Sequence, residues 1–380
     1  MDATQYLGSS PSAPLYPRSK YVAELRPVLP EGTFDLARSR VVLVPIYVAV
    51  IATAMIAIAR GWLPWPLVPV VSLVIGAGFA CLTFVAHEAL HGGIVRNKLL
   101  QQVIGWIGFL PFVVSPRLWC AWHNSSHHGN TNLPDDPDSY PTMDNYRTSS
   151  GARFAVDAFS LGGRRWRGGL SLILGFTVQS AHQLVTARGW GFLAGRQYAY
   201  AVAETALGVA VWTAVAALVG PLAFVFVFVI PLLVANAFVM AFILTNHSLS
   251  PQLSVNDPLV SGLTVTTSRI IELVTLGFGF HVEHHLFPAM SSRHAPAVRA
   301  AVQARWPERY QSMRLTAALL ALHRTARVYK DATTLCDPMT GQEFATLLPS
   351  GYRVQPIAIP APPLPACAVI STGTSRLNTV

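Results

Sequence analysis

The chain has 380 residues, of which 52% are hydrophobic and only 12% are charged. A soluble domain carries about 25% charged residues, so this composition excludes an ordinary water-soluble enzyme and predicts an integral membrane protein. We interpret the net charge of +9 as positive loops on the cytoplasmic side of a membrane, and we expect no nucleic-acid partner.

The first 86 residues predict a polar arm followed by two membrane spans. Residues 1–40 contain several prolines and arginines and are expected to form a mobile cytoplasmic arm. Residues 41–59 contain no charged side chain, and about 20 such residues suffice to cross the hydrocarbon. The break at residues 60–64 is too short for anything but a turn, so residues 66–86 are expected to return as the second span.

The middle of the chain predicts two further spans. Residues 103–114 are apolar but too short to cross, so we expect a re-entrant or interfacial segment. Within the arginine-rich residues 119–196, residues 170–185 are interpreted as an amphipathic helix lying in the interface. Residues 198–219 and 221–245 are the expected third and fourth spans.

The remainder predicts short cytoplasmic helices at residues 269–279, 296–305 and 314–329, and a disordered tail at residues 331–380. The predicted fold class is therefore an all-α integral membrane protein. Its four transmembrane helices form two hairpins with a cytoplasmic, histidine-rich helical cap, and residues 41–330 make up the membrane domain.

Most of the histidines gather near the ends of the predicted spans. They fall into three groups: His87 and His91; His123, His127 and His128; His281, His284 and His285. Because each hairpin returns the chain to the side on which it began, all three groups are expected on one cytoplasmic face. Imidazole is the commonest protein metal ligand, and two separate runs that end in His-His favour a metal site.

The spacing within the groups suits helices. If the second span continues by one turn, His87 and His91 stand on one helical face; taken alone, they could equally be interfacial histidines. In an α-helix His123 and His127 share a face, and His128 points elsewhere, about 100° away. Eight imidazoles exceed the four ligands of a zinc site and suffice for two metals with open positions.

A ninth candidate ligand is His247, at the end of the fourth span, where the alternative is a histidine placed on the helix dipole. Its neighbour Asn246 is a candidate for holding a metal-bound water. His182, His294 and His323 lie outside the groups and are expected to be structural or on the surface.

Acidic and aromatic residues flank the histidine groups. Metal-bound imidazoles usually donate their second N–H to a carboxylate or carbonyl. The candidate acids are Glu88, Glu283, Asp135, Asp136 and Asp138, although the three aspartates also suit an ordinary turn. The flanking aromatic residues, expected either beside the metals or as interface anchors, are Trp119, Trp122 and Phe280.

The histidine motifs carry a family resemblance. The segments HEALHG at residues 87–92, WHNSSHHGNTN at 122–132 and FHVEHHLFP at 280–288 resemble the three histidine boxes of the membrane fatty acid desaturase and hydroxylase superfamily. The resemblance covers about residues 41–330. It implies two irons that activate O2 as co-substrate, with the eight histidines of the three groups as ligands. His247 matches less well, since many members carry Asn where this chain has Ile243.

The resemblance implies an O2-dependent desaturase that introduces a double bond into a fatty acyl chain carried by a lipid, CoA or a carrier protein. The alternative within the superfamily is a carotenoid or alkyl hydroxylase or ketolase. A metal transporter is a different class, but it needs ionisable residues inside the spans, and three of the four have none.

The resemblance also bears on the electron donor and the location. His281 stands where relatives with a fused cytochrome b5 often have Gln, and no histidine precedes His87. A separate donor, ferredoxin or cytochrome b5, is therefore expected. We expect a multi-pass protein of the bacterial inner membrane with its catalytic face in the cytoplasm.

Overall fold

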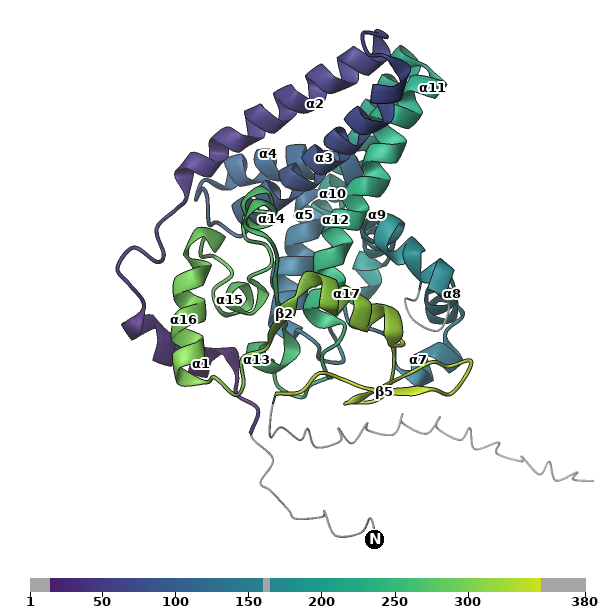
Figure 1. Cartoon of the computed structure of the whole chain (residues 1–380). Helices are drawn as coiled ribbons and strands as arrows, with labels where there is room; N and C mark the ends of the chain where they lie inside the picture. The colour runs from purple at the N-terminus through teal and green to yellow at the C-terminus, as the bar shows by residue number, and fades with distance from the viewer. Residues whose placement is uncertain (1–13, 160–164, 350–380) are drawn as a thin grey trace, which may run out of the picture.

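The computed structural model describes residues 14–159 and 165–349 (Figure 1), so parts of the expected arm and tail lie outside the described residues. The described chain is mostly helical. Four of its helical segments are long and apolar enough to cross a membrane: Arg38–Ala59, Trp65–Leu90, Gly195–Val219 and Pro221–His247. They coincide with the four predicted spans to within a few residues.

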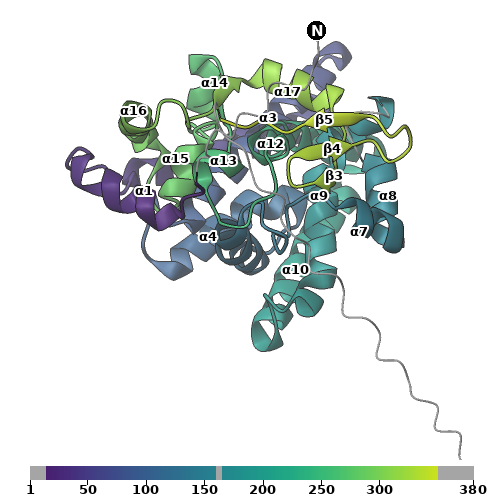
Figure 2. The same ribbon diagram turned by 90° about the horizontal axis from the view of Figure 1, so that it is seen from below.

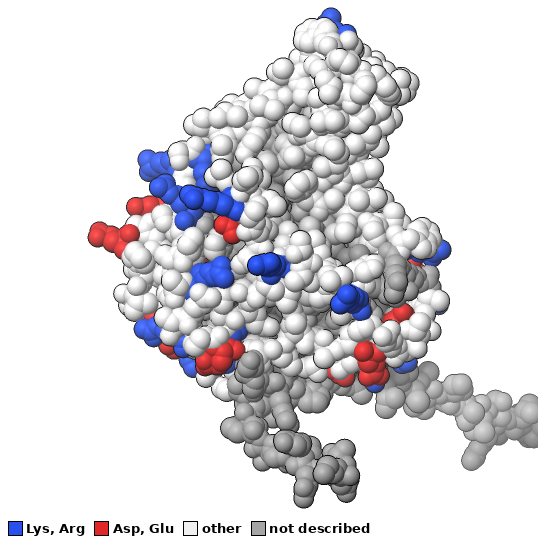
Figure 3. All heavy atoms as spheres, in the orientation of Figure 1, with Lys and Arg blue, Asp and Glu red and all other residues white. Residues whose placement is uncertain are grey.

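Helix α3 is the centre of these segments. The α-helices within them are α2 (Leu43–Ala59), α3 (Val68–Leu90), α10 (Gly195–Val219), α11 (Pro221–Phe224) and α12 (Ile230–His247). Helix α3 packs against both α2 and α12. It continues to Leu90, beyond the predicted end at residue 86, and therefore carries His87 on its last turn. Figure 3 shows that the part of the molecule built from α2, α3, α11 and α12 is nearly free of charged side chains except at its tip.

The chain bends sharply after α3. Helix α4 (Lys98–Phe109) is followed by α5 (Pro116–Trp119), and the segments Lys98–Phe112 and Pro116–Asn130 meet at 100°. Ser115 accepts hydrogen bonds from the first amides of α5 and donates one to Glu204 of α10 (2.6 Å). Arg117 pairs with the same carboxylate at 2.8 Å, so the one charge predicted inside the third span faces the protein.

The other α-helices form what we call the histidine end, the lower part of the molecule in Figure 1. They are α1 (Arg18–Leu25), α6 (His128–Asn130), α7 (Met143–Thr148), α8 (Ser150–Phe159), α9 (Arg165–Trp190), α13 (Pro258–Ser261), α14 (Arg269–Val274), α15 (His281–Leu286), α16 (Ala295–Arg305) and α17 (Leu315–Arg324). Helix α9 contains the predicted amphipathic helix, but it packs along α12. Asn236 of α12 binds Thr177 of α9 (2.9 Å), which fixes this contact.

Residues 14–40 differ from the expected mobile arm. Helix α1 buries Tyr21 and Leu25 against Val282, Leu286 and Val298 of α15 and α16. These two apolar residues are four positions apart and therefore share one helical face. That pattern is present in the sequence, but it is short and is surrounded by prolines and charges.

Two small sheets are a second departure from the all-α prediction. Strand β1 (Thr264–Thr266) pairs in parallel with β2 (Ser312–Arg314). An antiparallel sheet contains β3 (Val328–Asp331), β4 (Thr334–Cys336) and β5 (Glu343–Ala345). The helix predicted to continue to residue 329 therefore ends at Arg324, and the predicted tail boundary falls within β3. Strands of three or four residues are too short to leave a recognisable hydrophobic alternation.

The close approach of α3 and α4 generates a stability prediction. A Cβ atom at Gly108 would lie 2.5 Å from the carbonyl oxygen of Leu82, a backbone atom that cannot move aside alone. Gly108→Ala should therefore destabilise the fold by about 1–3 kcal/mol. Thermal unfolding in detergent measures the effect. Gly169→Ala is the control, because no atom lies within 4 Å of the added carbon; equal midpoints for both variants would contradict the prediction.

Candidate metal centre

The structure brings all nine predicted histidines together at the C-terminal ends of α3 and α12. They come from four separate parts of the chain: α3 and the residue after it, the segment preceding and starting α6, the end of α12, and α15. Their rings form a continuous set of contacts, as in the pairs His91–His284 and His128–His285. The remaining histidines, including the exposed His182, are not among these contacts within the described residues.

Seven of the nine histidines form two groups whose geometry suits metal ligation. In each group, one nitrogen from every ring lies within 4.8 Å of the others. The first group is His87, His91, His123 and His284, and the second is His127, His247 and His285. His87 and His91 share one helical face, as their spacing predicts.

His128 and His281 lie at the edges of these groups. The Nε2 atom of His128 is 3.2 Å from Nε2 of His123 and 3.1 Å from Nε2 of His284. The Nε2 atom of His281 contacts Nε2 of His247. Both rings therefore present a nitrogen to a group, and their role as ligands stays a prediction.

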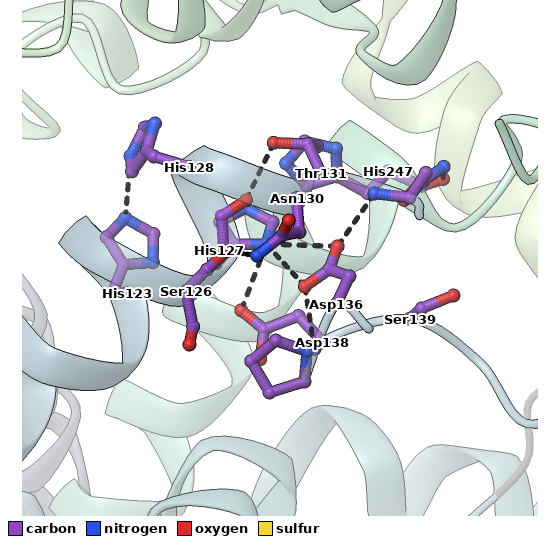
Figure 4. Close-up of polar contacts among 12 residues, drawn as sticks. His123, Ser126, His127, His128, Asn130, Thr131, Asp136, Asp138, Ser139 and His247 are labelled. Carbon is purple, nitrogen blue, oxygen red and sulfur yellow. Dashed lines mark hydrogen bonds and ion pairs between the residues drawn. The ribbon is translucent and has the colours of Figure 1, made fainter. Parts of the chain in front are cut away.

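The second histidine motif is not an α-helix. Residues Cys120–His127 form a π-helix, in which residues five apart come nearly into line. This geometry brings the Nε2 atoms of His123 and His128 within 3.2 Å of each other, with the two rings nearly perpendicular (Figure 4). The expectation that His123 and His128 point in different directions assumed α-helical spacing and was wrong, whereas the candidacy of His128 as a ligand stays a prediction.

In the second group, hydrogen bonds select which ring nitrogen is free. The Nδ1 atom of His127 lies 3.0 Å from Oδ1 of Asp136. The Nδ1 atom of His247 lies 2.9 Å from the carbonyl oxygen of Ser261. Carboxylates and carbonyls only accept, so each Nδ1 carries a proton and each Nε2 is the nitrogen available to a metal.

His285 follows the same pattern through a hydroxyl. The Thr131 hydroxyl donates its hydrogen to the carbonyl of His127 (2.9 Å). Its oxygen therefore accepts from Nδ1 of His285, at 3.2 Å. In all three rings Nδ1 is therefore taken by an acceptor and Nε2 faces the other rings of the group, as a metal site requires. Against the effect of burial, Asp136 and Asp138 raise the pKa of His127 to about 9, so this ring must lose its Nε2 proton when it binds a metal.

Two of the three candidate aspartates contact the site, and the third does not. Asp136 is buried beside His127, and it also accepts from the backbone amides of Asn132 and Asp138 (Figure 4). Asp138 lies 3.5 Å from the same imidazole. Asp135 is exposed, so the alternative of an ordinary solvated turn residue holds for Asp135 and not for Asp136 or Asp138.

Sequence reasoning missed part of this network. Gln179 of α9 and Trp122 both donate to Oδ1 of Asp138, each at 2.7 Å. With His123 and His127, Asp138 makes a third group whose atoms lie within 4.8 Å. Burial raises the pKa of Asp138 to about 6. The Asp-x-Asp spacing signalled the carboxylates, but nothing in the sequence signalled Gln179.

The other two acids bind elsewhere. Glu88 binds Arg40, Ser291 and Ser292, and Glu283 accepts from Thr264 and Tyr310. Neither makes a hydrogen bond to an imidazole within the described residues. The structure therefore does not support Glu88 and Glu283 as partners of the imidazoles, because their carboxylate oxygens accept hydrogen bonds from other groups.

The aromatic residues near the motifs are part of the site. Trp119 and Trp122 are buried, and Trp119 stacks on His123 with ring centroids 4.4 Å apart. Burial excludes the alternative in which they anchor the membrane interface. Phe280, with Phe84 and Phe278, lines a pocket that opens beside His87 and His284.

The donor set fits metal ions. Burial lowers the pKa of His284 and of His285 well below the usual range, and neighbouring imidazoles lower them further, so these rings are neutral as ligands must be. Nε2 of His91 is buried without a hydrogen-bond partner in the described chain. A bound cation would satisfy this nitrogen. Asn246 is also buried, and neither its amide nitrogen nor its oxygen has a partner there, so its role in holding a metal-bound water stays a prediction.

Four apolar helices long enough to cross a membrane thus carry, at one end, imidazole groups compatible with metal binding. The chain matches the fatty acid desaturase family model over residues 60–317. It therefore belongs to the fatty acid desaturase family, as the histidine motifs predicted.

Curated relatives agree with this assignment at low identity. The sn-1 oleoyl-lipid 12-desaturase of Arthrospira platensis is 24% identical over 281 residues, covering 69% of this chain and 75% of that protein. The chloroplastic omega-6 fatty acid desaturase of Spinacia oleracea is 23% identical over 257 residues, covering 64% and 55%. The Arabidopsis thaliana counterpart is 26% identical over 141 residues, covering 33% and 30%. The chain thus spans about a third to a half of these two plant relatives.

The hydrogen bond between Asp136 and His127 predicts the behaviour of a variant. Asp136→Asn should lower metal affinity about 10- to 100-fold at the second group, because an amide no longer fixes the proton on Nδ1. Elemental analysis after dialysis should show metal content falling toward half. Asp135→Asn, one residue away and exposed, should keep its metal; equal contents in both variants would refute this role for Asp136.

Proposed function

We propose that the chain is an O2-dependent desaturase that introduces a double bond into a fatty acyl chain and holds two irons. The observation that carries this proposal is the pair of imidazole groups at the C-terminal ends of the apolar helices α3 and α12. The chain that holds them belongs to the fatty acid desaturase family. Neutral imidazole is a suitable ligand for iron and leaves coordination positions open. His128 and His281 complete the proposed set of nine ligands.

An acyl methylene group carries no acidic proton, so acid–base side chains alone cannot remove its hydrogens. Bound iron would supply the oxidising power, by activating O2. The protein residues then orient the ligands, exclude water and position the acyl chain. The ligands of the second group are oriented by hydrogen bonds from their Nδ1 atoms to Asp136, Ser261 and Thr131, which leave Nε2 facing the group.

The pocket beside the first group supports an acyl substrate. Its wall combines Phe84, Phe278 and Phe280 with the imidazoles of His87, His281 and His284. The pocket is small, about 30 Å³, so we propose that it marks where an acyl segment approaches the metal ligands once the surrounding side chains make room for it. The acyl carrier, whether lipid, CoA or carrier protein, is part of the same proposal.

We also propose that the four spans form two hairpins in a bacterial inner membrane, with the histidine end in the cytoplasm. Residues 41–330 would then be the membrane domain. The gathering of charged side chains at the histidine end supports this orientation (Figure 3). A cytoplasmic site would receive electrons from a separate carrier, ferredoxin or cytochrome b5.

Product analysis tests the proposal. Expression in a host with a defined lipid composition, followed by gas chromatography of fatty acid methyl esters, should reveal a new unsaturated peak. His284→Ala should abolish both the peak and iron loading at the first group, because it removes a ligand nitrogen. His182→Ala, which changes an exposed histidine outside the site, should retain both.

The alternative outcomes are distinct. A hydroxylated acyl chain, or a modified carotenoid in a pigmented host, would replace the desaturase proposal with the hydroxylase or ketolase. Metal uptake without any lipid or pigment change would refute an enzyme of either kind. Retained product in His284→Ala would refute that residue's role as a ligand.

A further inference from the structure

Arg327 is a buried cation with no carboxylate partner among the described residues. It sits between α17 and β3 with only 6% of its surface exposed. In the described chain, its Nε and Nη2 atoms have no hydrogen-bond partner and no carboxylate pairs with it; the group that does interact with the guanidinium is the Tyr140 phenol. An unpaired buried charge costs several kcal/mol, so a missing partner is the simplest physical account of this position.

The two free atoms form a fork. In a guanidinium group Nε–H and Nη2–H point the same way, and together they match the two oxygens of a carboxylate or phosphate. The flat face of Arg327 is already used, because its Cζ atom lies 5.3 Å from the centroid of the Tyr140 ring. The stacking leaves the in-plane N–H groups unsatisfied.

Tyr140 adds a third donor. Its hydroxyl is buried and makes no well-directed hydrogen bond in the described chain, although Arg327 and Ser248 both lie close enough to interact with it. Burial raises the pKa of this hydroxyl, which therefore keeps its proton and can donate. Ser248, the residue after His247, lies beside it. The unused donors consequently meet at the end of α12, near β3 and α7, which Figures 1 and 2 show on the same side of the histidine end.

We infer that Arg327 and Tyr140 form a binding site for an oxyanion, a carboxylate or phosphate group held in two parallel hydrogen bonds by the guanidinium fork and in a third by the phenol. The group could belong to a free anion or to a lipid headgroup, since the three donors recognise the same chemistry in both. The site is separate from the metal ligands, and the inference does not depend on the reaction proposed above.

Thermal unfolding of the purified full chain in detergent tests the site, with inorganic phosphate and acetate as probes and chloride at equal ionic strength as reference. The wild-type midpoint should rise with phosphate and acetate beyond the chloride reference. Arg327→Met should show no such rise. The matched control Arg324→Met removes an exposed arginine three residues away, and it should respond as the wild type does.

The order of stabilities distinguishes an anion site from a structural arginine. Without added anion, Arg327→Met should unfold at the same or a higher temperature than the wild type, because it removes an unpaired buried charge. Saturating phosphate should reverse that order. A variant that is less stable by the same amount with and without phosphate would overturn the inference, as would a wild-type chain whose midpoint ignores both probes.

Two conservative variants keep the test valid if the methionine variant does not fold. Arg327→Lys keeps the charge but loses the fork, and it should weaken phosphate binding about tenfold. Tyr140→Phe removes one hydrogen bond and should weaken it about threefold to tenfold. Unchanged affinity in both variants would refute the site.

Short-chain phosphatidic acid identifies the source of the group. Binding much tighter than that of inorganic phosphate, and lost in Arg327→Lys, would assign the site to a lipid headgroup. Equal affinities would assign it to a free anion.

Discussion

The close burial of nine imidazoles against one another is the constraint on which the rest of the structure depends. A charged ring is costly in such a place, and burial lowers the pKa of His284 and His285 accordingly, whereas Asp136 and Asp138 raise that of His127. Asp136, Thr131 and Ser261 accept hydrogen bonds from three of the rings. All three acceptors come from segments without long regular structure.

Buried ion pairs fix those segments in turn. Glu88, next to His87, binds Arg40 and the serines that follow the third histidine motif. Asp257 binds Arg309 at 2.6 Å and Tyr21 at 2.9 Å, and so joins α1 to the loop before α13. Such pairs contribute little net stability, but breaking one leaves an uncompensated charge. They therefore favour a single arrangement of the motifs. Arg327 stands out against them, since it is as buried as Arg309 and has no carboxylate partner in the part of the chain that the structure describes.

The division of the molecule follows from the same requirement. The apolar helices carry few polar groups, whereas the histidine end supplies the donors and acceptors that the metal ligands need. The π-helix at Cys120–His127 marks the junction, and it turns neighbouring histidines toward different groups. A π-helix is rare and forms where the surrounding contacts favour it over an α-helix.

The sequence alone was sufficient to locate the four apolar segments and to name all nine histidines, because hydrophobic length and ligand type are local properties of the chain. It did not reveal α1, the short strands or the π-helix, since each depends on what packs against it. It named Asp136 and Asp138 as candidates but could not separate them from Glu88 and Glu283. The carbonyl of Ser261 has no sequence signature, and Gln179 binds Asp138 from 41 residues away. Tertiary structure alone decided these contacts, because a hydrogen bond depends on distance and direction in space and not on position along the chain.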